Sequence, residues 1–376
     1  MSKLWFLLFW AMLLSFAISY RDKYLCRVGG STHRYDKAFT LVLILLLGTF
    51  CGLRTFYNDT VTYVRIYAQA PVLKDFAEVN TSTYAQGIGF AYLNSLMKTL
   101  GFSTQDYLMF YSMVTAFCYV RFVRKNTDNF PLAVFLMFAT GFYTFAFAAI
   151  KQCMATAICL FGIDFLLRKK NILYTLFVIL ASLFHPYALV YLLLLLMDFR
   201  PLTWKTYLYI CCFVMAGFGL NSMVGTIVDM TAMMGANYDA TSFVGEGVNV
   251  FRVLVCFVPL VLAFLCGRNM FAHSTREENI LFNMVMLNAL IMFVGLFGTA
   301  NYFARLANYF LPAQVVVLPW MLRRIGGRDR QILTAMCVVG YTGYFVYGNL
   351  IQSVFDDCFD KITLWQYISL HFGAQS

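Results

Sequence analysis

The sequence predicts an all-α polytopic membrane protein, and three observations support this fold class. Of the 376 residues, 61% are hydrophobic and only 12% are charged, whereas a soluble domain carries about 25% charged residues. The apolar residues form runs of the length that crosses a bilayer as a helix. Lys and Arg residues gather in the segments between these runs, as they do in cytoplasmic loops. We therefore expect a single integral membrane domain over residues 1–376, with about 11–13 transmembrane helices.

The predicted spans follow from the lengths of the apolar runs. A transmembrane helix needs about 17–25 predominantly apolar residues. Runs close to this length are predicted to cross the membrane at 4–20, 38–54, 106–122, 131–149, 152–167, 206–222, 250–266, 280–298, 302–322 and 331–348. Basic residues mostly follow the first run rather than precede it, so we interpret that run as a retained span and not as a signal peptide.

The apolar stretch 172–197 needs a separate interpretation. It is too long for one span and short for two. His185 and Pro186 interrupt it near the middle, and proline removes a helix donor and clashes with the preceding turn. The stretch is therefore predicted to form a hairpin of two short helices.

The distribution of positive charge predicts the orientation of the chain. Most of the 28 Lys and Arg residues lie in the segments 21–37, 121–125, 168–170, 198–205, 268–276 and 323–330. One topology places all of these segments in the cytoplasm and both termini outside. It requires that 84–100 form an external or re-entrant helix instead of a span. The long external loops are then 55–105 and 223–249, and the second is rich in glycine and methionine, as a mobile lid would be.

Some cations lie outside these cytoplasmic loops. Arg54, Lys151, Arg252 and Arg305 each stand within a residue or two of the outer end of a predicted span. A cation at membrane depth is costly unless it is paired or solvated. We therefore expect an anion among them. Phosphate is a suitable one, because the fork of an arginine donates two parallel hydrogen bonds to it.

The cysteines indicate neither a disulfide framework nor a metal site. Most of the 11 lie inside apolar segments, and no CxxC or His/Cys metal spacing occurs. We expect them to be packing residues, and we expect neither a metal nor a cofactor. The net charge of +10 belongs to the loops of a membrane protein and does not predict nucleic-acid binding.

Four stretches of the chain resemble the EpsG/Wzy-type bacterial polysaccharide polymerases. GLRTFYNDTVTYVRIY (52–67) is similar to the opening of that family's first outer loop, and FAAIKQCMATAICLFGIDFLLRKKN (147–171) is similar to its RQ-containing segment. FVILASLFHPYALVYLLLLL (177–196) is similar to its histidine segment, and YFARLANYFLPAQVVVLP (302–319) to its late element with Arg, Tyr and Pro. The four occur in the family's order. Two positions depart from the pattern, since Lys151 replaces an arginine and Pro186 follows the histidine.

The resemblance implies an activity and a place in the cell. It implies polymerisation of undecaprenyl-diphosphate-linked oligosaccharide repeat units into capsular polysaccharide, exopolysaccharide or O-antigen at the outer face of the bacterial cytoplasmic membrane. The glycan moves from its lipid diphosphate to the non-reducing end of an incoming unit. The implied fold is a GT-C-like glycosyltransferase architecture with an outward-facing active site. The implied partners are the lipid-linked oligosaccharide and the bilayer, with a chain-length regulator and a flippase as further candidates.

This reaction assigns roles to the residues of the outer side. Cations hold the diphosphate as charge builds on the leaving phosphate, and the acceptor hydroxyl needs a base within hydrogen-bond reach. The predicted diphosphate ligands are Arg54, Arg65, Lys151, Arg252 and Arg305, the predicted sugar-binding residues are Tyr63, Gln152 and Tyr309, and the predicted catalytic residues are Asp59 and His185. Arg305 and Tyr309 stand four apart and are expected to share a helix face. The base is open between Asp59, His185 and an acid of 223–249.

The same residues allow plainer interpretations and other functions. Arg54 and Lys151 can anchor helix ends by snorkelling, and tyrosines are common in the interfacial belts of membrane proteins. One alternative function is a flippase or transporter for lipid-linked oligosaccharides, although such proteins usually show two related halves, which are not evident here. Another is a different membrane transferase, such as an O-antigen ligase or an acyltransferase.

Overall fold

The structure is a computed structural model that describes residues 2–29, 36–78, 87–233, 247–298, 300–348 and 360–372. Apart from one two-stranded sheet, the regular elements in this part of the chain are helices, which confirms the predicted all-α polytopic class. The chain divides into two compact units, Met1–Leu160 with Phe345–Ser376 (unit 1) and Phe161–Tyr344 (unit 2). The single membrane domain expected from the sequence stays a prediction.

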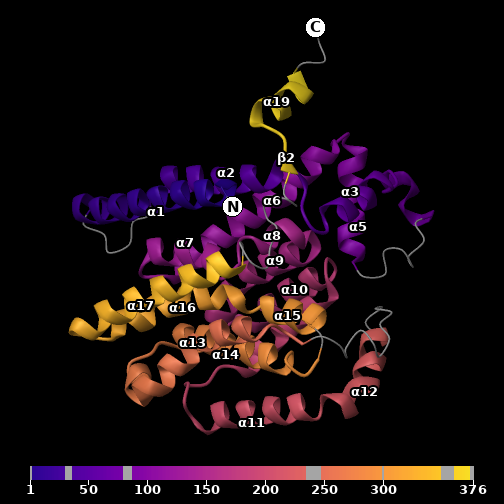
Figure 1. Ribbon diagram of the computed structural model, residues 1–376. Coiled ribbons are helices and arrows are strands. Elements are labelled where there is room, and N and C mark those ends of the chain that lie inside the picture. The colour runs from indigo at the N-terminus through magenta and orange to yellow at the C-terminus, as the bar shows by residue number, and fades with distance from the viewer. Residues whose placement is uncertain are drawn as a thin grey trace. The chain divides into compact units, whose positions relative to one another are not determined.

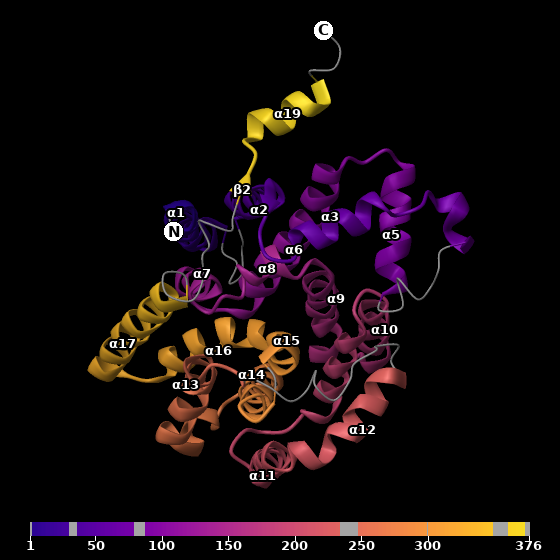
Figure 2. The same cartoon turned by 45° about the vertical axis from the view of Figure 1, so that its right-hand side comes forward.

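Unit 1 is built around the helix pair α2 and α6. Its elements in chain order are α1 (Ser2–Gly29), α2 (Lys37–Gly52), β1 (Arg54–Phe56), α3 (Thr60–Ala68), η1 (Leu73–Glu78), α5 (Ile88–Thr99), α6 (Thr104–Asn126), α7 (Phe130–Ala139), α8 (Phe145–Ala148), the first part of α9 (Ile150–Leu167), β2 (Asp360–Lys361) and α19 (Leu364–Phe372). Helices α1 and α2 lie side by side (Figure 1, Figure 2). Strands β1 and β2 pair antiparallel, which attaches the C-terminal segment to the end of α2.

Helices α2 and α6 pack closely because two glycines of α2 face α6. Gly48 and Gly52 are four apart and so lie on one helix face, and small residues let two helix backbones approach. A Cβ atom added at Gly52 would lie 2.6 Å from Sδ and 2.8 Å from Cα of Met109. At Gly48 the added atom would lie 3.2 Å from Cα of Met113. Since the later glycine meets the earlier methionine, the two helices run antiparallel.

The basic loops of unit 1 lie at the other end of this helix pair. Arg124 in the last turn of α6 forms an ion pair with Asp22 of α1 at 2.5 Å. Arg21 forms an ion pair at 3.2 Å with Asp36, which also caps the N-terminus of α2. The two loops of this unit that are predicted to be cytoplasmic therefore share one end.

Unit 2 is organised around helix α14. It contains the rest of α9, α10 (Asn171–Ser182), η2 (Pro186–Leu196), α11 (Trp204–Phe218), α12 (Leu220–Met233), α13 (Val250–Cys266), η4 (Gly267–Phe271), α14 (Arg276–Val294), α15 (Ala300–Asn308), α16 (Leu311–Arg324) and most of α17 (Gly327–Val346). Helix α14 contacts α11, α13, α15 and α16, and almost all of its residues are buried. Helix α10 packs on η2 with His185 at the break, which confirms the predicted hairpin.

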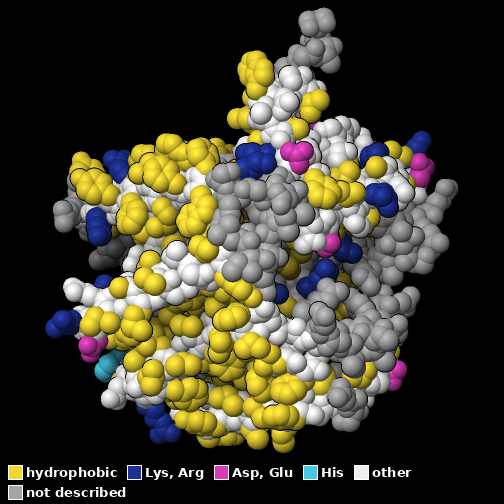
Figure 3. Space-filling model, viewed as in Figure 1, with side chains coloured by type: hydrophobic (Ala, Val, Ile, Leu, Met, Phe, Trp, Pro, Cys, Tyr) yellow, Lys and Arg dark blue, Asp and Glu magenta, His cyan; other side chains and the backbone are white. Residues whose placement is uncertain are grey.

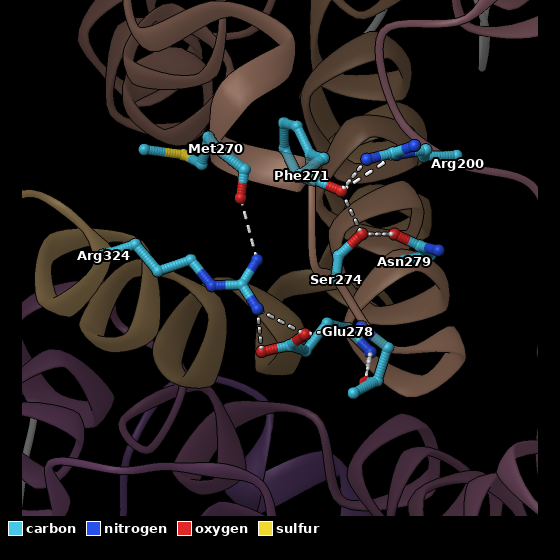
Figure 4. A network of polar contacts seen from close by, with 8 residues as sticks. Arg200, Met270, Phe271, Ser274, Glu278, Asn279 and Arg324 are labelled. Carbon is cyan, nitrogen blue, oxygen red and sulfur yellow. Dashed lines mark hydrogen bonds and ion pairs between the residues drawn. The ribbon is translucent and has the colours of Figure 1, made fainter.

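A network of polar contacts joins basic loops of unit 2 (Figure 4). The guanidinium of Arg324 donates to both carboxylate oxygens of Glu278, at 2.8 and 2.7 Å, and to the backbone carbonyl of Met270 at 2.8 Å. Arg200 donates two hydrogen bonds to the carbonyl of Phe271. These contacts join the turn after α13 to the loop after η2, and they join the last turn of α16 to the first turn of α14.

Arg276 connects the remaining basic loop to the same end of unit 2. It forms an ion pair with Asp198 at 2.8 Å and donates to the backbone carbonyls of Leu166 and Leu167 at 2.7 and 2.9 Å. The loops of unit 2 that the charge pattern assigns to the cytoplasm therefore gather at one end, which supports the sorting of the loops by charge.

Two predicted spans are interrupted, each for a local reason. The span 131–149 divides into α7 and α8, because Gly141 adopts a φ of 80° that ends the first helix. The span 302–322 divides into α15 and α16. Pro312 lies in the first turn of α16 and has no N–H with which to continue the hydrogen-bond ladder of α15.

The predicted external segments are more helical than expected. The span 206–222 ends early, at Gly219, and α12 then extends to Met233 into the predicted loop 223–249. Residues 234–246, about half of the predicted lid 223–249, lie outside the described part. Within 55–105 the chain forms β1, α3, η1 and α5. The 12 residues of α5 measure about 18 Å, too short for a bilayer core of about 30 Å, as expected for 84–100.

The apolar helices fit a protein that crosses a membrane several times. Among the described residues, four helices are long and apolar enough to cross: Lys3–Cys26, Ile150–Leu167, Val250–Phe271 and Arg276–Val294. Shorter apolar helices are Lys37–Gly52, Phe130–Ala139, Asn171–Ser182, Pro186–Leu196 and Trp204–Phe218. Helices α1 and α13 expose many hydrophobic side chains (Figure 3), as lipid-facing helices do. The number of crossings stays a prediction.

The glycine contact between α2 and α6 can be tested by adding one methyl group. Gly52→Ala places a Cβ against the backbone of Met109, so the helices have to separate, and we expect the free energy of unfolding to fall by about 1–3 kcal/mol. Thermal unfolding of the detergent-solubilised protein measures the change. Gly340→Ala in α17, where an added Cβ has open space, is the matched control. Equal melting temperatures for the two variants would contradict the close packing.

Candidate functional site

The predicted site residues form one group in each unit. Unit 1 holds Arg54, Asp59, Tyr63, Arg65, Lys151 and Gln152, and unit 2 holds His185, Arg252, Arg305 and Tyr309. In unit 1, Arg54 follows the C-terminal end of α2, whereas the basic loops lie at the opposite end of that helix.

Arg54 is fully buried at the C-terminal end of α2. Its Nη1 donates to the backbone carbonyl of Cys51 at 2.6 Å and to the hydroxyl of Ser112 in α6 at 3.0 Å, and its Nε donates to the hydroxyl of Thr60 at 3.2 Å. A cation is favourable here, because the last carbonyls of a helix are unsatisfied and carry partial negative charge. Within the described residues all of these acceptors are neutral, so no carboxylate balances the guanidinium.

The surroundings of Arg54 explain why its side chain is held in place. The Thr60 hydroxyl that accepts from Arg54 lies 2.6 Å from the carbonyl of Tyr57 and 3.3 Å from that of Phe147 in α8. Arg54 thus connects α2 with α3, α6 and α8. Because the side chain has no exposed surface, its contact with a diphosphate stays a prediction.

Asp59, Tyr63 and Arg65 lie on or beside α3. Asp59 occupies the N-cap position, and its backbone carbonyl accepts the N–H of Tyr63 at 3.1 Å. The Asp59 side chain makes no capping hydrogen bond and is half-buried, and Arg65 is exposed. A carboxylate is stabilised at a helix N-terminus by the helix dipole. Both charged groups therefore remain accessible to a ligand.

An aromatic cluster connects α3, α5 and α6 in unit 1. Its rings belong to Tyr63, Tyr67, Phe90, Tyr107 and Tyr111. Tyr63 meets the edge of Phe90 with ring centroids 6.1 Å apart, and Nζ of Lys151 lies 5.7 Å from the centroid of the same ring. The structure therefore brings together a predicted sugar-binding residue of α3 and a predicted phosphate ligand of α9.

Gln152 differs from its neighbour Lys151 in exposure. The side chain of Lys151 is half-buried, whereas Gln152 is only 2% exposed and points into the protein interior. The predicted contact of Gln152 with sugar hydroxyls is therefore not open in this arrangement and stays a prediction.

In unit 2, His185 is held by a row of tyrosines. Nδ1 of His185 and the hydroxyl of Tyr309 share a hydrogen bond of 2.8 Å. The Tyr191 hydroxyl donates to the backbone carbonyl of Tyr309 at 2.5 Å, and the Tyr174 hydroxyl donates to the carbonyl of Tyr191 at 2.6 Å. Because the three tyrosine side chains are buried, the row holds the His185 ring in one orientation.

Arg305 and Tyr309 do not share a helix face, contrary to the expectation from their spacing. Helix α15 ends at Asn308, so Tyr309 lies just beyond it. The Tyr309 side chain is fully buried, whereas Arg305 is exposed. From this position Tyr309 supports His185, and its predicted contact with a sugar stays untested. Arg305 remains accessible.

Arg252 and Arg305, the remaining candidates of unit 2, lie on helices that have one end held by an asparagine side chain. Arg252 is half-buried in the first turn of α13, whose N-terminus is capped by Asn249 through a 2.9 Å hydrogen bond from the N–H of Phe251. The end of α15 is fixed by Asn288 of α14, which donates to the carbonyl of Ala307 at 2.7 Å.

Sequence reasoning missed the residues that support the candidates. Tyr191 and Tyr174 orient Tyr309, Phe90 receives both Tyr63 and Lys151, and Asn288 fixes the end of α15. With 24 tyrosines and 39 phenylalanines in the chain, no spacing distinguishes these rings from lipid-facing ones. Asn288 carried a usable signal, because an amide inside a strongly apolar helix needs a hydrogen-bond partner.

Metal-ligating side chains do not cluster in the described part of the chain. No three His, Cys, Asp or Glu residues come together there in a way that could hold a metal ion. Every cysteine among the described residues is free, and Cys51, Cys153, Cys159, Cys256 and Cys337 are buried.

The fold and these residue groups define a polytopic α-helical membrane protein whose candidate cations and histidine stand at helix ends. The EpsG family matches residues 37–369, nearly the whole chain, and the protein belongs to this family. Membership indicates an exopolysaccharide polymerase. Comparison with curated proteins and with solved structures found no match, so the GT-C-like architecture stays a prediction.

Tyr67 makes a pH-dependent contribution to the packing of α3. Burial, and to a lesser extent the carboxylate of Asp106, raises the pKa of Tyr67 to about 12, and its hydroxyl donates to the carbonyl of Phe102 at 2.7 Å. The folded state holds the phenolic proton more tightly than the unfolded state, so this stabilisation is complete below pH 10 and is lost as the pH rises toward 12. Between pH 9 and 11 we expect a loss of about 1 kcal/mol.

Chemical denaturation at several pH values measures this contribution. Tyr67→Phe should lose stability less steeply over this pH range than the unmodified protein. Tyr92→Phe, which changes an exposed tyrosine of α5, should keep the original slope. An unchanged slope in Tyr67→Phe would show that Tyr67 does not titrate with folding.

Proposed function

We propose that the protein polymerises undecaprenyl-diphosphate-linked oligosaccharide repeat units at the outer face of the bacterial cytoplasmic membrane. The observation that carries the proposal is the EpsG family match over residues 37–369. The gathering of the basic loops at one end of each unit supports it, since it leaves Arg54 and Lys151 of unit 1 away from the cytoplasmic end. Polymerisation is a glycosyl transfer, so the protein acts as a membrane glycosyltransferase.

The transfer breaks one bond and forms another at the anomeric carbon of the growing glycan. The C1–O bond to the lipid diphosphate breaks, and a hydroxyl oxygen at the non-reducing end of the incoming unit bonds to C1. The hydroxyl proton passes to a base, and the lipid diphosphate leaves with the electron pair of the broken bond. Catalysis therefore requires a base at the acceptor and positive charge at the diphosphate.

His185 is the base in this proposal, because its ring is already oriented. When Nδ1–H donates to the Tyr309 oxygen, Nε2 is the ring nitrogen that takes the proton of the acceptor hydroxyl. A base held by a third group in this way is the usual arrangement of catalytic histidines. Asp59 of unit 1, whose carboxylate is half-buried, is the alternative candidate for the base.

Exposed and half-buried cations are the diphosphate ligands in this proposal. Arg305 and Arg65 are exposed, and Lys151 and Arg252 are half-buried, so a phosphate can reach them without unfolding a helix end. Arg54 contributes positive charge from the interior at the end of α2. Arginine is the better ligand at an exposed position because its planar fork matches two phosphate oxygens.

Arg305 provides the most direct test of the polymerase proposal. Removal of one preorganised charge donor typically lowers a transfer rate about 100-fold or more, so Arg305→Ala should leave single repeat units on the lipid and little long polymer. Gel separation of lipid-linked glycans measures chain length in cells that carry the variant as their only copy. Arg330→Ala, which removes an exposed arginine near the start of α17, should give the full ladder.

The length of the lipid-linked glycans also distinguishes a polymerase from a transporter. Long chains of normal amount from Arg305→Ala would remove Arg305 from the site. If deletion of the gene instead prevents single units from reaching the outer face, the protein is a transporter and the polymerase proposal fails.

The hydrogen bond between Tyr309 and His185 predicts that substitutions of these two residues do not have additive effects on the polymerisation rate. Tyr309 acts through His185, so Tyr309→Phe should lower the polymerisation rate about 10-fold, and adding it to His185→Ala should lower the rate no further. Tyr341→Phe removes a buried hydroxyl of α17 that lies outside this row, and its effect should add to that of His185→Ala. Additive loss from Tyr309→Phe would assign Tyr309 to packing alone. The rate of polymer formation by membrane vesicles, relative to the amount of folded protein, is the measurement.

A further inference from the structure

The C-terminal helix α19 makes few contacts with the rest of unit 1. It extends away from the layer formed by α1 and α2 (Figure 1, Figure 2). Its apolar side chains are largely exposed, with Trp365 at 77% and Leu364 at 51%. Leu364, Trp365 and Ile368 follow the spacing of one helix face, and no residue of the helix LWQYISLHF carries a formal charge. Hydrophobic side chains are visible on this segment in Figure 3.

Two hydrogen bonds, here called the tethers, attach the segment that contains α19 to one end of the helix pair α2 and α6. The N–H of Ile362 donates to the carbonyl of Leu53 at 3.0 Å, directly after the last residue of α2. The Tyr367 hydroxyl donates to the carboxylate of Asp106 at 2.7 Å, in the first turn of α6. Because α2 and α6 run antiparallel, these two points lie at the same end of the helix pair. Helix α19 therefore begins at the end of the helix pair where the apolar helix α2 stops and α6 starts.

A third contact strengthens the attachment of this segment. Nζ of Lys361 lies 4.2 Å from the ring centroid of Phe50 in the last turn of α2. Lys361 is half-buried, and this burial, with a smaller contribution from Lys3, lowers the pKa of its ammonium group. The attachment is thus confined to the end of the helix pair α2 and α6, and among the described residues Leu364, Trp365, Ile368 and Leu370 of α19 remain exposed.

A helix of this length requires a surface to stabilise it. α19 has 9 residues, and isolated helices shorter than about 12–15 residues are marginal in water. Amphipathic helices of this kind form when their apolar face enters the boundary between headgroups and acyl chains. Trp and Tyr are enriched at that boundary because their rings have an apolar body and a polar group.

We propose that α19 lies in the interfacial region of the bilayer, in the leaflet that holds the C-terminal end of α2, with Leu364, Trp365 and Ile368 inserted among the acyl chains. We assign the apolar face of α19 to a lipid surface because the tethers place this helix at the end of the apolar helix α2, where a membrane-spanning helix meets the headgroup region. The absence of charge on the helix also fits a neutral phospholipid interface better than a charged protein surface. This inference is independent of the proposed function.

The depth of Trp365 in a lipid bilayer tests the proposal. The full-length protein is reconstituted in phosphatidylcholine vesicles whose acyl chains carry bromine at carbons close to, or far from, the headgroup. The difference in fluorescence between the unmodified protein and Trp365→Phe isolates one of the 5 tryptophans. We expect bromolipids to quench this component at least 2-fold, and the shallow bromine to quench it more strongly than the deep one.

Trp10 serves as the matched control, and quenching by iodide in water measures the exposure of Trp365 to solvent. Trp10 of α1 is exposed at 41% within a predicted span, so the component removed by Trp10→Phe should be quenched more strongly by the deep bromine. Quenching of the Trp365 component by iodide in water, with no effect of bromolipids, would overturn the proposal. Loss of bromolipid quenching as the protein-to-lipid ratio rises, together with crosslinks between copies, would also overturn it in favour of a second copy of the chain.

Discussion

The buried guanidinium of Arg54 is the contact on which the organisation of unit 1 depends. It ties the last turn of α2 to α6 through Ser112 and to α3 through Thr60, whose hydroxyl also lies within reach of a carbonyl of α8. A charge buried among neutral acceptors is stable only if each of its donors is well placed. The same contact satisfies the carbonyl end of α2 and holds positive charge where the apolar helix stops.

In unit 2, buried hydrogen bonds likewise hold a polar side chain at the end of a helix. His185 lies at a break between two apolar helices, where its ring would otherwise be free to rotate. The hydroxyl of Tyr309 fixes it, and Tyr191 and Tyr174 fix Tyr309 through backbone carbonyls. Each phenol in this row satisfies a buried carbonyl or the histidine ring, so the row removes the cost of burying polar groups and orients a candidate base at the same time.

Charge patterning and apolar run length predicted the fold class, the hairpin at His185 and the grouping of the basic loops within each unit. These features depend on local composition, which is readable from one chain. The predictions failed where a single residue outweighed the composition around it. Gly141 divides one predicted span through its positive φ, and Pro312 divides another by removing a helix donor. Both residues were visible in the sequence, but their effect depends on the helix geometry around them.

The sequence by itself determined that this protein is a helical membrane protein whose basic residues gather in the segments between apolar runs, because hydrophobicity and charge act residue by residue. Only the tertiary structure decided which candidates face inward and which remain accessible. Arg54, Gln152 and Tyr309 are buried, whereas Arg65 and Arg305 are exposed, although all five looked alike in an apolar sequence. The physical reason is that burial depends on contacts between residues far apart in the chain, such as the 2.8 Å hydrogen bond between Tyr309 and His185.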